Sequence, residues 1–321
     1  MIRSVRALAV VLLLVPAALC AHVGGVDSQG GHTDRSADTY HFHRGPLKGQ
    51  SFADKAAGTA ALAALGGEAV QQVTVPPPKE AIPATRKGTS DPFDLSLFLP
   101  TSDVAGQVVV HSAYTLEYSE EHEQAAWVVY RITGYQLNDP VERTDDFRSD
   151  PLVGSGSAIL EDYAGSGYDR GHLAPAAAMA WARHVMSESF LLSNMSPQEP
   201  GFNRGVWKKL EAKVREFATV HEEVIVVTGP VLQEELPKIG PSGVSVPNYY
   251  YKVILDYVPP VTSGIGFVLP NESSDRPLAA FAVPIDSVEV LTGIDFFAPL
   301  DDENEAEMEG RVDLEHWFPK Q

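Results

Sequence analysis

The sequence predicts an α+β domain, because strand-like segments outnumber helix-like ones and the two kinds do not alternate regularly. Runs rich in Val, Tyr and Trp occupy 106–119 and 125–133, well before the one strongly amphipathic helical pattern at 205–218. A doubly wound parallel sheet would instead alternate strand and helix along the chain. We therefore expect a mixed, mainly antiparallel sheet with helices packed on it.

Each expected element has a local reason. The helix at 205–218 places Val206, Leu210, Val214 and Phe217 at helical spacing, with charges on the other side. The segment 174–191 reads as a loop that enters a helical or irregular stretch. Residues 222–232 predict a buried strand followed by a Gly-Pro turn, and 248–258 and 264–271 predict two further strands. Residues 280–296 predict a proline-broken strand and a short helix.

The first residues are typical of a secretory signal peptide. Arg3 and Arg6 precede an apolar run at 7–19, and small residues follow near Ala21. The run is shorter than the ~20 apolar residues that span a bilayer. Cleavage near Ala21 would remove Cys20, the only cysteine, so the mature chain would have neither a disulfide nor a thiol nucleophile. We expect export to the periplasm or the medium, with no membrane attachment afterwards.

Composition divides the rest of the chain. Residues 22–52 are rich in Gly and His, 53–90 are Ala-rich and then Pro-rich, and 91–321 have the composition of a packed domain. The middle segment reads as a short helix that runs into an extended linker. We expect one large domain, 91–321, that carries the function.

The segment "HVGGVDSQGGHTDRSADTYHFH" contains a second candidate metal site. His32, His41 and His43, with Asp34 or His22, could bind Zn²⁺ or another transition metal. The alternative is a disordered polar stalk, and the sequence leaves both open. Neither reading makes this segment the catalytic part.

The formal net charge of −19 argues against a protein that coats nucleic acid, because polyanions are usually met by basic surfaces. A nucleic-acid role would need a local basic cluster. Lysines on a helix surface usually only aid solubility, but the densest cationic run lies between 203 and 217 and contains Arg204, Lys208, Lys209, Lys213 and Arg215.

Chemistry is concentrated in "YDRGHLAP", residues 168–175. His172 has a side chain suited to general-base work near neutral pH, and Arg170 offers a planar fork for a phosphate. Gly171 is expected to let the backbone bend so that both side chains face one pocket, and Asp169 to act as a structural acceptor. The alternative is a surface loop with an ordinary ion pair.

Further polar residues follow in "LLSNMSPQEPGFNRGVWKKLE", residues 191–211. Asn203, just before the predicted helix, has a carbonyl oxygen that suits a hard divalent cation such as Mg²⁺. Glu211 lies two turns further on the same side and could hold one of the cation's waters. The alternatives are a helix N-cap for Asn203 and a solvated acid, paired with Lys208 or Arg215, for Glu211.

A base, a cation, a metal ligand and a carboxylate together suit phosphodiester hydrolysis. A neutral histidine can take a proton from the attacking water, and a hydrated divalent ion can stabilise the leaving alkoxide. No covalent intermediate is required, which agrees with the absence of cysteine from the mature chain.

Five motifs then make the chain resemble the DNA/RNA non-specific endonucleases, the family of the secreted Serratia-type nuclease and mitochondrial endonuclease G. They occur in order over 91–318: "SGYDRGHLAPAAAM", "FLLSNMSPQEPGFNRGVWKKLE", "VVTGPVL", "YYKVIL" and "LTGIDFF". The resemblance implies a ββα-metal core and cleavage of DNA and RNA that depends on Mg²⁺ or Mn²⁺ and leaves 5′-phosphate ends.

The resemblance also implies roles for individual residues. His172 is similar to the general base, Asn203 to the direct metal ligand and Glu211 to the carboxylate that binds a metal water. Arg170 is similar to a phosphate or transition-state contact, Asn194 to the asparagine that helps orient the scissile region, and Arg148 to a weaker phosphate contact. Arg204 is a further candidate for phosphate contact because it belongs to the cationic run at 203–217. The chain departs from the secreted Serratia-type pattern in having no disulfide, and from basic nucleases in its charge.

Two other functions are compatible with these residues. One is a phosphodiesterase with a narrower substrate, and the other is a secreted, non-catalytic metal-binding protein on a nuclease-like scaffold. The sequence leaves open whether the chain forms a homodimer.

Overall fold

The computed structural model describes residues 31–34, 39–42, 51–57, 59, 95–102, 106–257, 263–298, 306 and 308–319. The expected signal peptide at 1–21 and most of the expected linker at 53–90 lie outside the described residues. Within the described ranges, no helix is both long enough and apolar enough to cross a bilayer.

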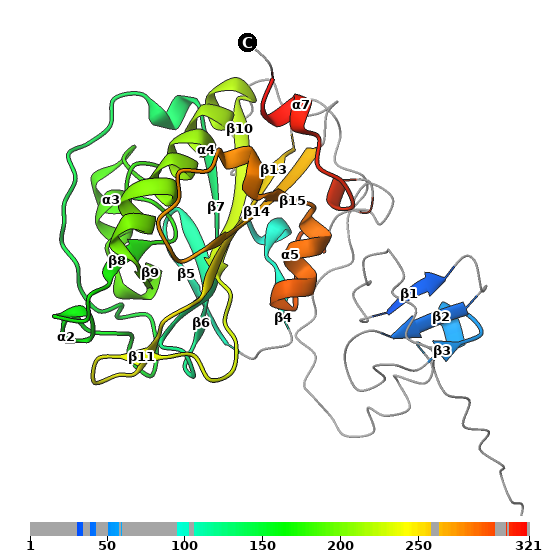
Figure 1. Ribbon diagram of the computed structural model, residues 1–321, viewed down its shortest axis with the longest axis horizontal. Coiled ribbons are helices and arrows are strands. Elements are labelled where there is room, and N and C mark those ends of the chain that lie inside the picture. Colours follow the sequence, from blue (N-terminus) through cyan, green and yellow to red (C-terminus); the bar gives the residue numbers. More distant parts are fainter. Residues whose placement is uncertain are drawn as a thin grey trace, which may run out of the picture.

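A seven-stranded antiparallel sheet forms the centre of the large domain (Figure 1), which confirms the predicted fold class. β7 and β10 lie in its middle, and Val226 of β10 pairs with Tyr130 of β7. The strands, in spatial order, are β15 (Ala282–Val283), β14 (Ser263–Pro270), β13 (Tyr249–Asp256), β10 (Glu223–Pro230), β7 (Gln124–Thr133), β6 (Tyr114–Ser119) and β5 (Gln107–Val110).

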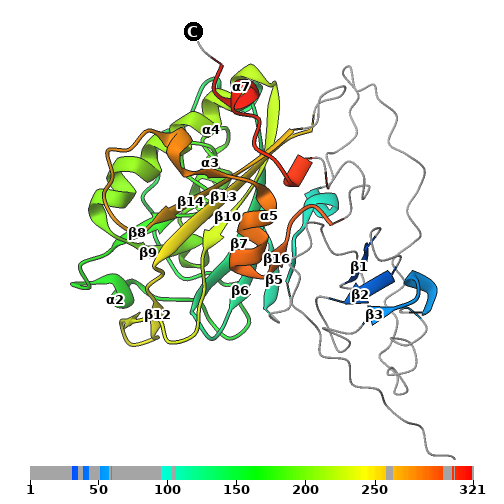
Figure 2. The ribbon, with the colours of Figure 1, turned by 45° about the vertical axis from the view of Figure 1, so that its right-hand side comes forward.

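Both faces of this sheet are buried, so its central strands are apolar on both sides. Along β7, Val128 packs in the core cluster that contains Leu210 of α4, whereas Val129 packs in the cluster that contains Val288 of α5. Successive side chains of a strand point to opposite faces, which produces this division. Figures 1 and 2 show α4 and α5 on opposite sides of the sheet.

The helices are short except for α4. The described ones are α2 (Leu160–Tyr163), α3 (Arg183–Glu188), α4 (Lys208–Val220), α5 (Ile285–Thr292) and α7 (Leu314–Trp317), with 3₁₀ turns at Leu95–Phe98, Tyr135–Leu137, Leu192–Asn194 and Leu278–Phe281. α4 is preceded by a wide, π-helical turn, Phe202–Trp207, in which Gly205 departs from helical geometry with φ −102° and ψ −108°. The predicted helix at 205–218 is therefore confirmed, with an irregular first turn.

Three two-stranded pairs and one small sheet complete the described structure. The pairs are β4 (Thr101–Ser102) with β16 (Ile294–Asp295), β8 (Asp169–His172) with β9 (Met195–Gln198), and β11 (Lys238–Ile239) with β12 (Val244–Ser245). In the N-terminal segment, β1 (Gly31–Asp34), β2 (Thr39–Phe42) and β3 (Ser51–Phe52) form a sheet in which Tyr40 and Phe42 are buried.

One sequence prediction about the sheet is wrong. Gly229 and Pro230 do not form a turn but continue β10, where they pair with Tyr251 and Tyr250 of β13. A Cβ atom on Gly229 would lie 2.3 Å from the backbone oxygen of Ala126, so the glycine serves close approach of two strands.

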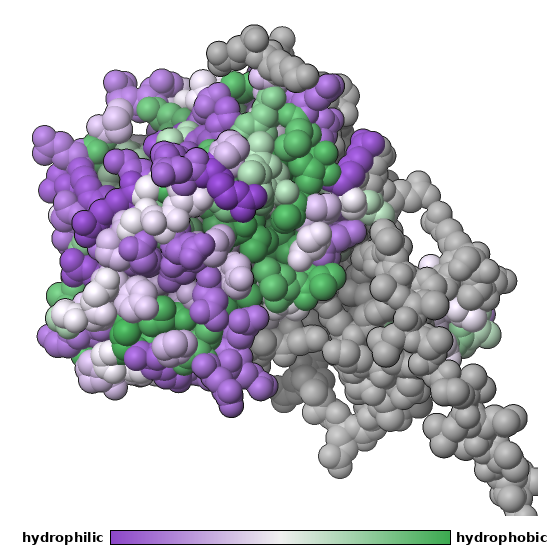
Figure 3. All heavy atoms as spheres, in the orientation of Figure 1, coloured by the Kyte–Doolittle hydropathy of each residue, from purple (hydrophilic) through white to green (hydrophobic). Residues whose placement is uncertain are grey.

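The surface over α5 differs from the rest of the visible face. Figure 3 shows hydrophobic colour gathered there, where Val290 is 88% exposed, while the flank that carries α3 and α4 is mainly hydrophilic. The flank that holds the predicted site residues is therefore the polar one.

Candidate active site

The β8–β9 pair and the helical run after it bring the predicted residues together. His172 pairs with Met195 and Asp169 with Gln198. The chain then turns at once into the helical run, because the Glu199 carboxylate accepts a hydrogen bond of 2.7 Å from the Phe202 backbone N–H. Two strands and a helix thus form one compact unit, the ββα arrangement implied by the family resemblance.

Glycine is needed at position 171 for a different reason from the one that the sequence suggested. Its backbone is extended, within β8, and does not bend the chain. A Cβ atom there would lie 2.1 Å from the side chain of Gln198 on β9. The glycine is needed for space, since the Gln198 side chain crosses directly over it.

Asp169 fastens the strand to the wide turn. Its carboxylate accepts hydrogen bonds from Nδ2 of Asn203 at 2.9 Å and from Nε and Nη2 of Arg204 at 2.8 and 2.6 Å. Partial burial would raise the pKa of Asp169, but the bonds from Arg204 and Asn203 outweigh burial and lower it. Asp169 is the structural acceptor that the sequence predicts.

This bond also fixes the orientation of the Asn203 amide. Since Nδ2 donates to Asp169, Oδ1 is left as the acceptor that Asn203 presents elsewhere. The N-cap alternative is wrong, because α4 begins after Trp207 and has no side-chain cap.

His172 lies in an aromatic environment with one unsatisfied nitrogen. Its ring packs edge-on against Phe190 and Phe147, with centroids 4.9 and 5.9 Å away. Nε2 is buried and has no hydrogen-bond partner. Burial lowers the pKa of His172 to about 3, with Arg143 and Arg170 adding to the effect. The imidazole is therefore neutral at pH 7 and able to accept a proton.

Arg170 shares this face of β8. Its guanidinium lies 4.1 Å from the centre of the Phe147 ring, the same ring that contacts His172. Residues two apart on a strand point the same way, which explains why both meet one aromatic side chain. The predicted cation and the predicted base are therefore neighbours.

Glu211 lies in the first turn of α4, and its carboxyl group is shielded from water. Burial raises the pKa of its carboxyl, although Lys252, Arg215 and Arg143 oppose the rise. Its carboxylate receives no hydrogen bond from any described residue. Such a carboxylate gains from a positive charge brought beside it.

Lys252 is a buried cation that the sequence reasoning missed. It is fully buried on β13, donates to Oγ1 of Thr228 at 2.9 Å, and lies 4.6 Å from the centre of the Trp207 ring. Burial lowers its pKa, and Glu211 opposes that change. A charged residue inside the apolar run "YYYKVIL" is the sequence signal that could have revealed it.

Asn203 and Glu211 fit a hard divalent cation. Both offer oxygen atoms, the ligand type that Mg²⁺ and Mn²⁺ prefer. Asn203 presents an oriented carbonyl oxygen, and Glu211 a half-buried carboxylate that receives no hydrogen bond from the described residues. Few protein ligands suffice, because Mg²⁺ keeps most of its waters.

Two further arginines reach the site. The charge of Arg143 acts to lower the pKa of both His172 and Glu211. Arg215 donates a hydrogen bond to the Glu211 backbone oxygen at 3.2 Å. Both line an open groove whose other walls include Val141, Ala176, Ala180 and Met186. Arg215 belongs to the cationic run that the sequence singles out, whereas no pattern marks Arg143.

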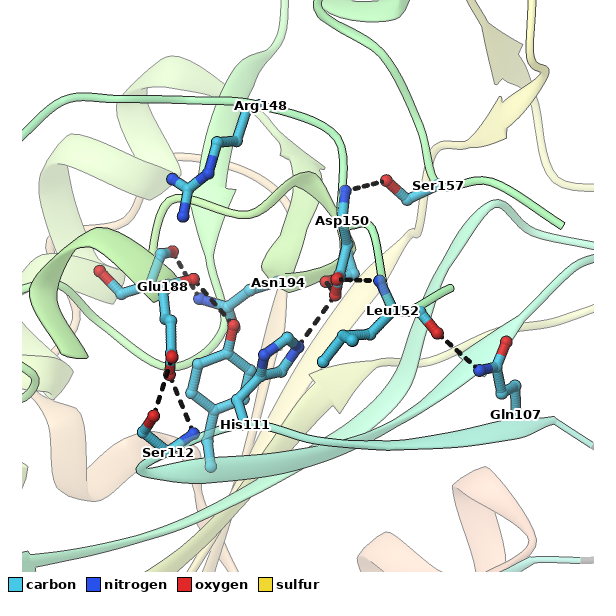
Figure 4. Close-up of polar contacts among 12 residues, drawn as sticks. Gln107, His111, Ser112, Arg148, Asp150, Leu152, Ser157, Glu188 and Asn194 are labelled. Carbon is cyan, nitrogen blue, oxygen red and sulfur yellow. Dashed lines mark hydrogen bonds and ion pairs between the residues drawn. The ribbon is translucent and has the colours of Figure 1, made fainter. Parts of the chain in front are cut away.

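Asn194, one of the residues labelled in Figure 4, is fully buried and its amide bonds the backbone. Oδ1 accepts from the Ala174 N–H at 2.9 Å, and Nδ2 donates to the backbone oxygens of Ala174 and Ser189. Asn194 thus positions the segment that follows His172, and its implied role in orienting the scissile region stays a prediction.

The other two predicted arginines are also engaged elsewhere. Arg148 donates to the Asp146 carboxylate at 2.9 Å and to the Ser187 oxygen at 3.0 Å, beside the network of Figure 4. Arg204 is held by Asp169, although its side chain is 73% exposed. Substrate contact by Arg148 or Arg204 stays a prediction.

The N-terminal histidines form a separate group. His32 and His41 are paired in register across β1 and β2. His43 lies outside the described residues, as does His22. Zinc binding by this segment stays a prediction.

Comparison with known proteins identifies close relatives of this arrangement. The model of the DNA/RNA non-specific endonuclease family matches residues 97–303. Nuclease C1 of Cunninghamella echinulata var. echinulata is 37% identical over 211 residues, which cover 59% of this chain and 82% of that protein. Mitochondrial endonuclease G of Homo sapiens is 35% identical over 208 residues, covering 59% and 69%. The solved structure of an EndoG/EndoGI complex matches with a TM-score of 0.58 and 34% identity, over 63% of this chain and 89% of that one.

Proposed function

Because the chain belongs to the DNA/RNA non-specific endonuclease family, we propose that it is a metal-dependent endonuclease that hydrolyses phosphodiester bonds in both DNA and RNA. It is a hydrolase, with His172 as general base and a divalent cation, Mg²⁺ or Mn²⁺, held by Asn203 and, through water, by Glu211. Little sequence preference is expected.

One observation carries this proposal. A neutral histidine with an unpartnered buried nitrogen lies in the same ββα unit as an amide oriented by Asp169 and a carboxyl whose pKa is raised. Buried polar groups are normally satisfied, so the unpartnered Nε2 of His172, beside a carboxyl with a perturbed pKa, favours function rather than packing.

The chain's own residues perform most of the reaction. His172 accepts a proton from water as the water oxygen bonds to phosphorus, and the bond from phosphorus to the 3′ oxygen breaks, which leaves a 5′-phosphate. The anionic phosphate beside the ring raises the pKa of His172 and so favours the transfer. Arg170 and Arg143 stabilise the charge that develops on the phosphate oxygens. When bound, the divalent cation neutralises the leaving oxygen.

The proposal extends to location and to a second metal. The sequence at 1–21 supports export, after which the mature chain would act in the periplasm or the medium on DNA and RNA. Zn²⁺ at His32, His41 and His43 is proposed as a separate, non-catalytic property.

Cleavage by the purified mature chain tests the function. Supercoiled plasmid and a structured RNA are incubated with chain stripped by EDTA, then with Mg²⁺, Mn²⁺, Ca²⁺ or Zn²⁺ added back. We expect both substrates to be cut only with Mg²⁺ or Mn²⁺. Cleavage of one substrate alone would indicate a narrower phosphodiesterase, and no cleavage with any ion would overturn the proposal.

A further inference from the structure

Two histidines and one aspartate meet far from the active site. Nδ1 of His221 lies 2.9 Å from Oδ2 of Asp256, and Nε2 of His316 lies 3.0 Å from the same oxygen. The two imidazole rings are 4.5 Å apart, centroid to centroid. The three ligand atoms lie within 4.8 Å of one another. We propose that His221, Asp256 and His316 form a transition-metal site of the Zn²⁺ class.

The chemistry of the three donors favours such an ion. Two imidazole nitrogens and one carboxylate oxygen form a ligand set that Zn²⁺ accepts, with a water completing the tetrahedron. Zinc bonds of 2.0–2.2 Å place tetrahedral ligand atoms roughly 3.3 Å apart. The observed separations of 2.9 and 3.0 Å need to open only slightly.

The two imidazole rings can present lone pairs to a metal. Where a ring nitrogen now donates an N–H to Asp256, a ring that carries one proton can hold it on its other nitrogen instead, which frees the lone pair that faces Asp256.

The surroundings of the cluster also favour a cation, and they leave one side of the site open to water. His221 follows the last residue of α4, where the helix dipole is negative. The Asp256 side chain is 4% exposed, but those of His221 and His316 are 12% and 20% exposed. One side of the cluster is thus open to a water ligand.

The site would tie three distant elements together. Asp256 ends β13, His221 ends α4, and His316 lies in α7, whose Trp317 packs 4.8 Å from Phe217. Ten helical residues separate His221 from Glu211, or about 15 Å along the axis. The ion would therefore stabilise the C-terminal segment and leave hydrolysis unchanged.

Zinc titration of the full chain tests the site. Calorimetry is done with excess Mg²⁺ present, in a background where His32, His41 and His43 are changed to Gln. We expect one Zn²⁺ per chain and a higher melting temperature with zinc. His316→Gln should weaken binding at least about tenfold, while the matched control His184→Gln on α3 should bind as the background does.

A second measurement guards against misfolding of the variant. Co²⁺ is added to the unsubstituted background, and a site of two imidazoles and a carboxylate should give visible absorption bands of low-coordinate Co²⁺. Absence of both zinc uptake and cobalt bands would overturn the proposal. Undiminished zinc binding by a folded His316→Gln chain would also overturn it. Since the readouts are metal binding and melting temperature, these outcomes do not depend on nuclease activity.

Discussion

His172 and His111 occupy opposite kinds of environment within one domain. Nε2 of His111 donates to the Asp150 carboxylate at 2.9 Å, and this aspartate also accepts from Oγ of Ser193 at 2.5 Å and from the Leu152 N–H at 2.9 Å (Figure 4). His172 has aromatic neighbours and a buried Nε2 with no partner. Both rings lie in segments that contact the same sheet.

The difference separates stabilisation from chemistry. A satisfied buried network contributes to stability, and breaking it leaves an uncompensated group. An unsatisfied buried nitrogen costs stability and is retained where a substrate or proton will occupy it. Substitution of His172 should therefore mainly lower activity, whereas substitution in the His111–Asp150 network should mainly lower folding stability.

The largest effect is expected for His172→Ala. Loss of the general base should lower kcat/KM for plasmid cleavage by roughly 10²- to 10⁴-fold. The melting temperature should fall only modestly, because no hydrogen bond to Nε2 is lost. Turnover near that of the parent chain would refute the base assignment.

Asp150→Asn should destabilise the fold, because it changes the acceptor in the His111–Asp150 network. The buried network loses the charged acceptor of three hydrogen bonds, which costs about 1–3 kcal/mol. Urea unfolding should therefore shift to clearly lower concentrations. Activity per folded molecule should remain close to that of the parent chain. A large loss of kcat with unchanged stability would contradict the structural role of the network.

Asn203→Ala should act on metal affinity. The Mg²⁺ concentration for half-maximal cleavage should rise by about tenfold or more, with less effect at saturating metal. Asp169→Asn provides a useful comparison, because it removes the acceptor that orients Asn203 without removing the ligand. An unchanged metal titration in Asn203→Ala would exclude that ligand role.

The smallest expected effect is the pH dependence of the stability that Asp150 contributes. Burial would raise the pKa of Asp150, but hydrogen bonds from His111, Ser193 and the Leu152 N–H outweigh it and lower the pKa. Its contribution is therefore complete above the unfolded pKa of about 3.9 and is lost as pH falls through the lower folded value. The difference in unfolding free energy between the parent chain and Asp150→Asn should therefore narrow as the pH falls below 4. A gap that widens in acid would contradict this sign.

Contiguous motifs made much of the site predictable. His172, Arg170, Asn203 and Glu211 lie in two short segments, and helical spacing predicted the helix that carries Glu211. The pairing of β8 with β9 was not predicted, because a bent loop was expected at Gly171. The strands at 125–133 and 222–232 were equally legible, because buried central strands need continuous apolar runs.

Features that depend on distant contacts were not predictable. Asn194 looked available until its amide was found bonded to Ala174 and Ser189, and Arg143 reaches the site from a loop without any motif. The His221–Asp256–His316 cluster joins residues from three elements, which no local pattern connects. Sequence reports residue types well, but the direction of a polar side chain is decided by tertiary packing.

The wide turn at Phe202–Trp207 makes the catalytic segment sensitive to its length. An α-helix advances about 100° per residue, so one residue more or fewer in this turn would rotate all of α4 relative to β8. Glu211 would then face away from Asn203, although every site residue would still be present. Insertions and deletions here should consequently inactivate the protein more often than point substitutions on the helix surface.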